Sequence, residues 1–276
     1  MKYIVMLLLF INFSYSQDVV TYKIDYFSGN NLHCDTNNED AKKLFKIGIE
    51  TLHMNTMLDK KYLKKTADVF FRAFKLDSTF CDAIFFSGYT YGLTGERKIA
   101  LGCYYIADSL SNNKSIEFKI NLAAEALKVG NFEGMKLARK KYNEVIQFFP
   151  ESSEGYYGHA ITSPEIGDIE KGLENLNIAL DKNNFLYHNN NFNQSNFLKG
   201  VLLTLNKKYE EGLEYFEMCY NANKKDLNFK IHYSLCLLKV SEIKNDPKMK
   251  EKSKKMYNKI DNKDMIPKEI KDLLIF

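Results

Sequence analysis

Small and bulky residues recur along the chain with the spacing of one helical face. A small residue is followed four positions later by a bulky one, and three positions after that by another small or β-branched residue. Steps of four and three keep all three residues on the same side of an α-helix. Each copy predicts a helix in which one large side chain lies between two positions of close approach. The six copies are Thr66/Phe70/Ala73, Ala100/Tyr104/Ala107, Ala138/Tyr142/Val145, Gly172/Leu176/Ala179, Gly212/Phe216/Cys219 and Ser253/Tyr257/Ile260.

A second helix is predicted before each copy, and it carries a small residue of its own. Glycine inside a helix costs about 1 kcal/mol relative to alanine, so its recurrence indicates that close helix packing outweighs the lost propensity. Turn signals such as GLTG at 92–95 and GDI at 167–169 separate the two helices. The sequence therefore predicts repeated helix pairs. The small residues of the upstream helices are Gly48, Gly88, Ala123, Gly158, Gly200 and Ser234.

The repeat resembles that of the tetratricopeptide family, a helix-turn-helix of about 34 residues. The segment 81–114 carries the residues of that pattern at the family's spacing, and a second good copy begins at Gln194. The family's tryptophan is missing throughout. The resemblance covers about Asp40 to Ile266, and it implies an all-α fold, a right-handed α-α superhelix of about six helix pairs with a concave surface. The matching residues are Gly88, Tyr91, Ala100, Tyr104 and Ala107 in the first segment and Gly200, Tyr209, Gly212 and Phe216 in the second.

Three segments fall outside the regular pattern. Residues 17–39 contain the alternating run VVTYKIDYF, which predicts a short strand or an extended arm. The Asn-rich stretch 183–196 predicts a long loop. Residues 267–276 (PKEIKDLLIF) predict a capping helix that begins at Pro267, with its last four residues covering the end of the stack. The alternative for this tail is an exposed docking signal.

The first 16 residues have the composition of a cleaved signal peptide. Lys2 precedes an apolar run from Tyr3 to Phe13, and Ser14 and Ser16 follow at the spacing of a cleavage site. The run would rise only about 15 Å as a helix, which is too short to span a membrane. No cysteine follows it directly, as a lipoprotein would require. We expect an exported, periplasmic or extracellular chain without an integral membrane segment, and N-terminal sequencing should find Gln17 first.

Composition narrows the classes of partner. The formal net charge is only +4, and the one dense basic cluster, 248–255, contains Glu251 and lies on a predicted helix. A solvated helix face explains it better than a nucleic-acid site. Abundant Lys and Asn indicate an AT-rich bacterial gene. We therefore expect a protein or peptide partner and no nucleic acid.

Chemistry-bearing motifs are not apparent. The five histidines (His33, His53, His159, His188 and His232) show no metal-ligand spacing, and neither a phosphate loop nor a nucleophile elbow occurs. We expect no catalytic site, no cofactor and no metal. A glycan-processing enzyme has no residues in its favour.

The five cysteines divide into two groups. Cys34 precedes the first helix and Cys81 opens the first helix of the second pair, and these helix starts lie side by side in a repeat stack. A disulfide there is a hypothesis, and it would stabilise the fold by about 4 kcal/mol in the chain-entropy model. The remaining cysteines, Cys103, Cys219 and Cys236, are expected to be buried free thiols.

Aromatic residues on the first helices suggest where a partner binds. The resemblance implies a concave groove lined by those helices, and Phe85, Tyr89 and His159 are its candidate residues. A clamp for a C-terminal carboxylate is not expected, because aromatic residues replace its Lys and Asn. For Phe45 and Phe197 a place in the core is an equal alternative to exposure. The function expected is a non-enzymatic adaptor or scaffold of the envelope; the alternative is a structural subunit of an export or motility complex.

Overall fold

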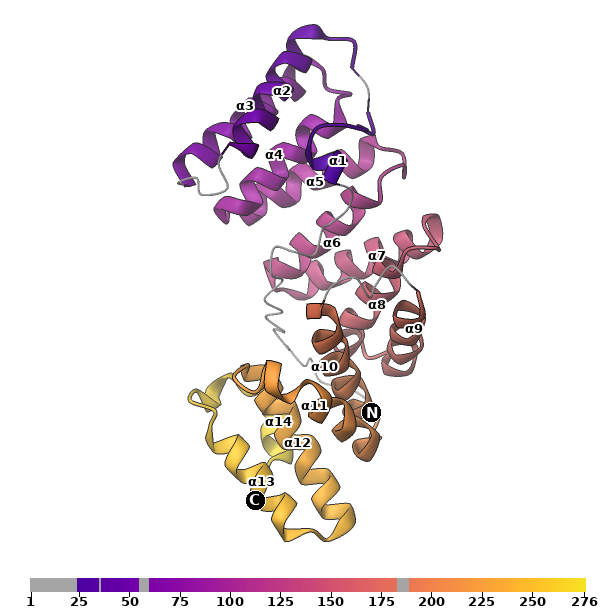
Figure 1. Cartoon of the computed structure of the whole chain (residues 1–276), viewed down its shortest axis with the longest axis vertical. Coiled ribbons are helices and arrows are strands. Elements are labelled where there is room, and N and C mark those ends of the chain that lie inside the picture. Colours follow the sequence, from indigo (N-terminus) through magenta and orange to yellow (C-terminus); the bar gives the residue numbers. More distant parts are fainter. Residues whose placement is uncertain (1–23, 35, 55–59, 183–188) are drawn as a thin grey trace. The chain divides into compact units, whose positions relative to one another are not determined.

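The computed structural model describes residues 24–34, 36–54, 60–182 and 189–276, in which every regular element is a helix (Figure 1). The chain divides at Pro150 and Glu151 into two compact units. The repeat array predicted over 40–266 extends over both units. Residues 1–23, which include the predicted signal peptide and the start of the predicted arm, lie outside the described residues.

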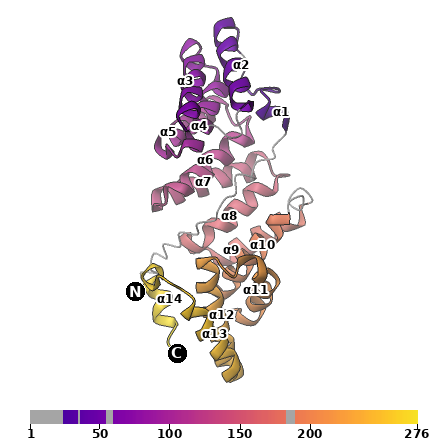
Figure 2. The same cartoon turned by 60° about the vertical axis from the view of Figure 1, so that its left-hand side comes forward.

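Three helix pairs form the N-terminal unit, and three more form the C-terminal unit (Figures 1 and 2). We call the earlier member of each pair its first helix and the later member its second helix. Among the described residues, the six predicted pairs and the all-α superhelical fold class are thus confirmed. The N-terminal pairs are α2 (Glu39–His53) with α3 (Lys60–Leu76), α4 (Cys81–Thr94) with α5 (Arg97–Leu110), and α6 (Ile116–Val129) with α7 (Phe132–Phe148). The C-terminal pairs are α8 (Ser153–Ile166) with α9 (Ile169–Asp181), α10 (Asn189–Leu205) with α11 (Tyr209–Asn223), and α12 (Leu227–Lys244) with α13 (Pro247–Asn258).

A glycine in several of the first helices makes room for the second helix of its pair. A Cβ added to Gly48 would lie 2.5 Å from the ring of Phe70, and one added to Gly200 would lie 3.1 Å from the ring of Phe216. Both rings are the bulky residues of the repeated pattern. In these two pairs, the periodicity in the sequence therefore reflects an aromatic ring packed directly against the backbone of a glycine.

Left-handed residues end several first helices. Gly95 has a φ of 87° and Gly167 a φ of 90°, and each is followed within two residues by the second helix of its pair. A residue with a Cβ is strained in this conformation, which glycine adopts freely. The turns predicted at 92–95 and 167–169 are confirmed.

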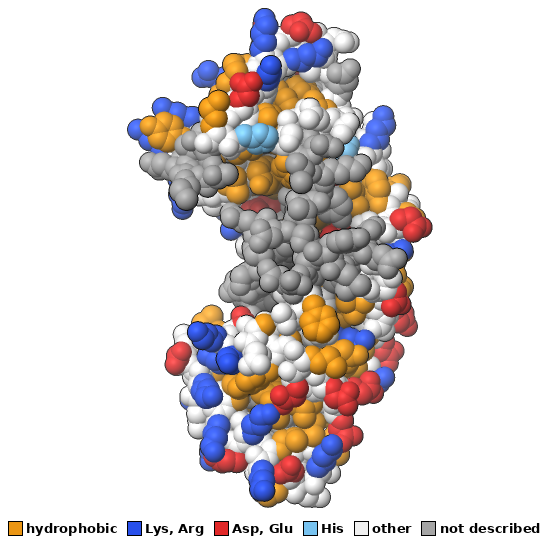
Figure 3. All heavy atoms as spheres, in the orientation of Figure 1, with side chains coloured by type: hydrophobic (Ala, Val, Ile, Leu, Met, Phe, Trp, Pro, Cys, Tyr) orange, Lys and Arg blue, Asp and Glu red, His pale blue; other side chains and the backbone are white. Residues whose placement is uncertain are grey.

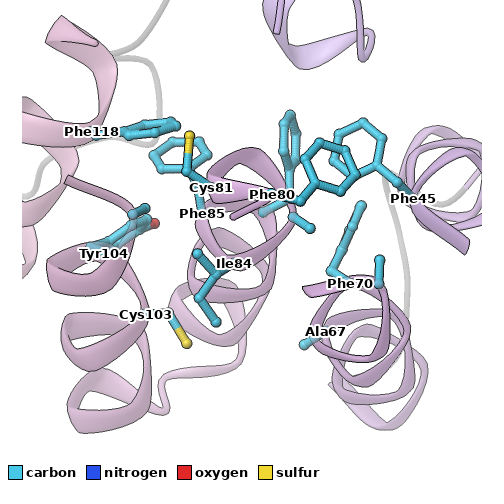
Figure 4. Packing of buried hydrophobic residues seen from close by; sticks show 14 of the residues in the cluster. Phe45, Ala67, Phe70, Phe80, Cys81, Ile84, Phe85, Cys103, Tyr104 and Phe118 are labelled. Atoms are coloured by element: carbon cyan, nitrogen blue, oxygen red, sulfur yellow. The ribbon is translucent and has the colours of Figure 1, made fainter. Parts of the chain in front are cut away.

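An aromatic core runs through the N-terminal unit. Phe45, Phe70, Phe86 and Phe80 pack around the contact of α2, α3 and α4, and Phe85 stacks on Phe118 of α6 with ring centroids 4.6 Å apart (Figure 4). All of these rings are buried. Stacked and edge-to-face pairs add to the hydrophobic gain of burial, so neighbouring helix pairs share one continuous core.

The chain ends and the Asn-rich segment differ from expectation. Residues 24–27 form the short helix α1 (Ile24–Phe27), so this part of the arm is neither a strand nor extended. The predicted loop 183–196 is helical from Asn189 onward, while 183–188 lie outside the described residues. Its asparagines cost helix propensity, and the packing of α10 outweighs this cost.

The C-terminal segment packs against the C-terminal unit through Ile270 and through two of its last four residues, Leu274 and Phe276. After a 3-10 turn (η2, Lys263–Met265), helix α14 (Lys268–Leu273) buries Ile270, and Leu274 is buried directly after it. Phe276 packs against Tyr257 with ring centroids 5.4 Å apart. Leu273 and Ile275 are exposed, because a helix this short can turn only one side toward α12. Within the described residues, no helix has the length and apolar content needed to cross a bilayer.

Candidate functional site

A segment of the chain itself lies on the first helices of the N-terminal unit. Residues 24–34, which we call the strap, comprise α1 and the bend that follows it. The strap contacts α2, α4 and α6. We call the contacted surface the first-helix face, and its residues are His53 of α2, Asp82, Phe85, Phe86 and Tyr89 of α4, and Glu117 and Phe118 of α6.

Two adjacent aromatic residues of the strap are seated on this face. The Tyr26 ring is buried, with its centroid 5.7 Å from that of Phe85 and 5.4 Å from that of Phe86. The Phe27 ring lies 5.1 Å from that of Tyr89. Rings at these separations are in contact, and each buries an area that dominates local packing energy.

Asp82, in the first turn of α4, is the polar centre of the face. Its carboxylate accepts hydrogen bonds from the Tyr26 hydroxyl at 2.8 Å, the His33 backbone N–H at 3.0 Å and the Cys34 backbone N–H at 2.7 Å. Burial raises the pKa of Asp82, and the hydrogen bonds from Cys34, Tyr26 and His33 oppose that effect. All three donors come from the strap.

A second polar contact joins the strap to α6. The His33 Nε2 atom lies 3.1 Å from Glu117 Oε2, and the Ser115 hydroxyl donates to the same carboxylate at 3.2 Å. Burial acts to raise the pKa of Glu117, but the hydrogen bond from His33 and the other donors outweigh it and hold that pKa below its usual value. On α2, His53 Nε2 lies 2.8 Å from the Phe27 carbonyl oxygen. The strap thus has a polar anchor on every first helix of its unit.

The end of the strap is fixed covalently. The sulfur atoms of Cys34 and Cys81 are joined in a disulfide, with Cα atoms 5.5 Å apart. Cys103, Cys219 and Cys236 are free and buried, as the sequence predicted. Burial raises the pKa of Cys103 to about 11, which leaves it as an unreactive thiol at neutral pH.

The groove predicted from the sequence is wrong in two of its three residues. Phe85 is 0% exposed and belongs to the core, between Tyr104, Phe118 and the strap. His159 is 2% exposed and lies in the C-terminal unit, with Nε2 3.3 Å from Asp168 Oδ2. Tyr89 does lie on the first-helix face, where Phe27 half-covers it.

The sequence correctly predicted aromatic residues on the first helices, but it did not predict that the strap covers them. Phe45 and Phe197, for which both readings were open, are also buried. The residues missed were Tyr26, His33, Asp82 and Glu117. A signal existed in the adjacent aromatic pair of the strap and in an acid next to Cys81, but it depends on the strap folding back.

A buried ion cluster elsewhere in the N-terminal unit has no free group. Lys119 and Lys141 each contact Asp108 and Glu144, at N to O distances of 2.6 to 3.0 Å. The charges balance, and the cluster joins α5, α6 and α7. Its role is structural, because each of its charges is already paired.

Unpartnered polar groups occur on first helices of the C-terminal unit. The Ser195 hydroxyl and the Asn196 Nδ2 on α10, and both ring nitrogens of His232 on α12, are buried without a hydrogen-bond partner. Burial lowers the pKa of His232 to about 4, so the ring is neutral at pH 7. Buried polar groups in native proteins are nearly always paired, so this group requires an explanation.

Neither charge nor metal ligands define another site in the described residues. On the face shown in Figure 3, basic and acidic side chains both occur on each unit. One group of three potential ligands comes together, Cys34, Cys81 and Asp82, but its two sulfur atoms are bonded to each other.

Comparison with known proteins supports the fold. No protein-family model matches the chain, and no curated protein does. Among solved structures, YrrB, described as a TPR protein with an unusual peptide-binding site, superposes with a TM-score of 0.54 at 16% identity, over 79% of this chain and 94% of that one. PilF of Pseudomonas aeruginosa gives 0.55 at 14% identity, over 80% and 93%.

A further match is the Cut9–Hcn1 hetero-tetramer of the APC/C, with a TM-score of 0.59 at 16% identity. It covers 85% of this chain but only 42% of that longer chain. At such identities the likeness concerns the fold alone. Together with the six helix pairs, these matches define a helical repeat protein. More narrowly, its repeats have the tetratricopeptide-like fold.

Proposed function

We propose that this chain is a non-enzymatic scaffold that holds a polypeptide segment of a partner protein on its first helices. One observation carries the proposal: the first helices of the N-terminal unit already hold a bent polypeptide segment, the strap. They do so with aromatic contacts, an acid that accepts backbone N–H groups, and a ring nitrogen at a carbonyl oxygen. These are the contacts that peptide recognition uses.

In the oxidised chain, the C-terminal unit takes the partner. The N-terminal first-helix face is filled by the strap, whereas the Ser195 hydroxyl, the Asn196 Nδ2 atom and both ring nitrogens of His232 on α10 and α12 have no hydrogen-bond partner. These atoms are buried in the free chain, so a partner segment reaches them only where its binding displaces the side chains that cover them, and it then offers amide donors and carbonyl acceptors. Phe192 of α10, 55% exposed, adds an aromatic anchor on a first helix. The known structure YrrB, whose description names a peptide-binding site, supports the same kind of use for this fold.

The location we propose is the periplasm or the extracellular space. The Cys34–Cys81 disulfide supports it, because structural disulfides persist in oxidising compartments and are rare in the cytosol. The signal-peptide pattern of residues 1–16 supports it independently. The function is therefore proposed for an exported protein of the cell envelope.

The alternative is a structural subunit of an export or motility complex, held through its second helices. Tyr105, Ile106 and Ile99 on α5 favour it, because they are exposed apolar side chains on one second helix. Such a patch is a common mark of a permanent interface. The two functions differ in which helices contact the partner.

Site-specific photo-crosslinking tests the proposal. A photoreactive phenylalanine analogue is placed at Phe192 on α10 or at Met218 on α11, which are 55% and 58% exposed and belong to the same helix pair. In envelope preparations, the probe at 192 should crosslink to one defined partner, and the probe at 218 should give at least tenfold less product. Crosslinking from 218 alone would favour the structural subunit.

A further inference from the structure

The strap occupies the first-helix face as a ligand would. It contributes little to the repeat pattern, yet its Tyr26 is among the most deeply buried side chains of the N-terminal unit. Its contacts fall on α2, α4 and α6, the first helices. The strap precedes the helix pairs in the sequence and contacts all three of them. Its side chains and backbone groups therefore show which kind of peptide this face can bind.

Asp82 sets the most specific requirement on a bound peptide. If the strap were to leave, the Tyr26 hydroxyl and both backbone N–H donors would leave with it, and a buried carboxylate would lose these three partners. Water would then take the place of these donors, so a segment that replaces the strap must bring donors of the same kind to offset the desolvation of the carboxylate. The face therefore fits a segment with adjacent aromatic residues, of which the first carries a hydroxyl, followed by a bend that presents two N–H groups.

The disulfide adds control over this contact. The strap is tethered to α2 through residues 35–38 in any case, and the bond from Cys34 to Cys81 fixes its end beside Asp82. With both ends of the bend fixed, the two amides cannot leave the carboxylate independently. A covalent closure of this kind raises the effective concentration of the bound segment.

We propose that the first-helix face of the N-terminal unit is a peptide-binding surface whose occupant is the chain's own strap, with Cys34–Cys81 as its redox latch. This inference rests on the proposed function in one respect: both assume that polypeptide segments bind to the first helices. An added segment with the chemistry of the strap gains access when the latch opens and the strap's own contacts are weakened.

Opening of the latch requires a dithiol reductant. Its thiolate attacks the sulfur of Cys34, which is the less buried of the two, and the bond to Cys81 breaks with Cys81 leaving as a thiolate that takes up a proton. The second thiol of the reductant then attacks the mixed disulfide, releasing Cys34 as a thiol. Two electrons and two protons pass to the protein, and the reductant becomes a disulfide.

A synthetic peptide tests the surface. The probe is a fluorescent peptide of residues 24–34 with Cys34→Ser, and the receptor is the full chain with Tyr26→Ala, Phe27→Ala and Cys34→Ser, which disables its own strap. The control peptide carries Tyr26→Ala and Phe27→Ala in addition. We expect the probe to bind this receptor at least tenfold more tightly than the control peptide, and the oxidised natural chain to bind neither. Equal affinity for the two peptides, or equal binding by the oxidised natural chain, overturns the proposal.

Amide hydrogen exchange of the natural chain tests the latch, and it decides the matter if the triple variant does not fold. Reduction should accelerate exchange of the His33 and Cys34 amides at least tenfold. The Phe229 amide, which donates to the Asp226 carboxylate at 2.8 Å in the C-terminal unit, is the matched control and should not change. Unchanged exchange at His33 and Cys34 contradicts a latch.

Size-exclusion chromatography of the reduced chain adds a third readout. A dimer that exchanges straps between two copies would support the surface, because it repeats the same contacts in trans. The peptide and exchange experiments use no partner protein. They can therefore fail while crosslinking from position 192 succeeds, or succeed while it fails.

Discussion

His232 is the residue whose burial has the clearest consequence for pH dependence. Its pKa falls from 6.5 in water to about 4 in the fold because the ring is desolvated. Below pH 6.5 the unfolded chain therefore binds a proton that the folded chain does not. Stability from this residue is fully present above pH 6.5 and is lost as pH falls toward 4, by about 3 kcal/mol at about 1.4 kcal/mol per pKa unit.

The substitution His232→Phe isolates this contribution, because it keeps a ring of similar size and removes the titrating nitrogens. We expect the free energy of unfolding of the natural chain, minus that of the variant, to fall as pH is lowered from 6.5 to 4. Denaturant unfolding at several pH values measures it. A difference that is independent of pH would show that His232 is solvated in the folded chain.

Close packing of a helix pair depends on glycine at single positions of the first helix. Gly48→Ala in α2 should destabilise the N-terminal unit, because the new Cβ would lie 2.5 Å from the buried Phe70 ring, and overpacking of a core costs about 1–3 kcal/mol. Gly102→Ala in α5 is the matched control. Its Cβ meets no atom within 4 Å, so it should gain up to about 1 kcal/mol of helix propensity.

Denaturant unfolding midpoints of the two glycine variants provide the measurement. The midpoint of Gly48→Ala should be lower than that of the natural chain, and the midpoint of Gly102→Ala higher. Adding Phe70→Leu to Gly48→Ala should recover part of the loss, since the smaller side chain frees space. Equal midpoints for both glycine variants would contradict the packing described for α2 and α3.

At the same scale, the sequence was informative wherever the pattern is local. The spacing of Thr66, Phe70 and Ala73 predicted the packed face of α3, and glycine turns predicted the ends of α4 and α8. The start of α10 was missed because its asparagines favour turns when considered alone. Later residues of α10, such as Phe197, pack against α11 and α12 and stabilise the helix, and such packing is not a local property of the sequence.

The candidate site was predicted less well, for a physical reason. An aromatic residue such as Phe85 has the same helical position whether it faces solvent or a covering segment. The strap is held by contacts between residues far apart in the sequence, such as those of Tyr26 and His33 with Asp82, which are 56 and 49 positions apart. No periodicity within the chain encodes such contacts, so neither the strap nor the role of Asp82 followed from spacing.

In the whole molecule, the first helices of the two units differ in what they contact. The first helices of the N-terminal unit already hold a polypeptide segment, whereas those of the C-terminal unit carry buried polar groups without partners. In the oxidised chain, a partner protein is thus expected to engage α8, α10 and α12. The strap then acts as a resident ligand that keeps the other first-helix face closed.

Amide hydrogen exchange of the oxidised chain, alone and in complex with the partner captured from position 192, tests this claim most directly. Binding should slow exchange in the first helices α8, α10 and α12, by at least tenfold at the most protected amides, and leave the second helices α9, α11 and α13 nearly unchanged. Protection confined to the second helices would contradict the account and identify the chain as a structural subunit.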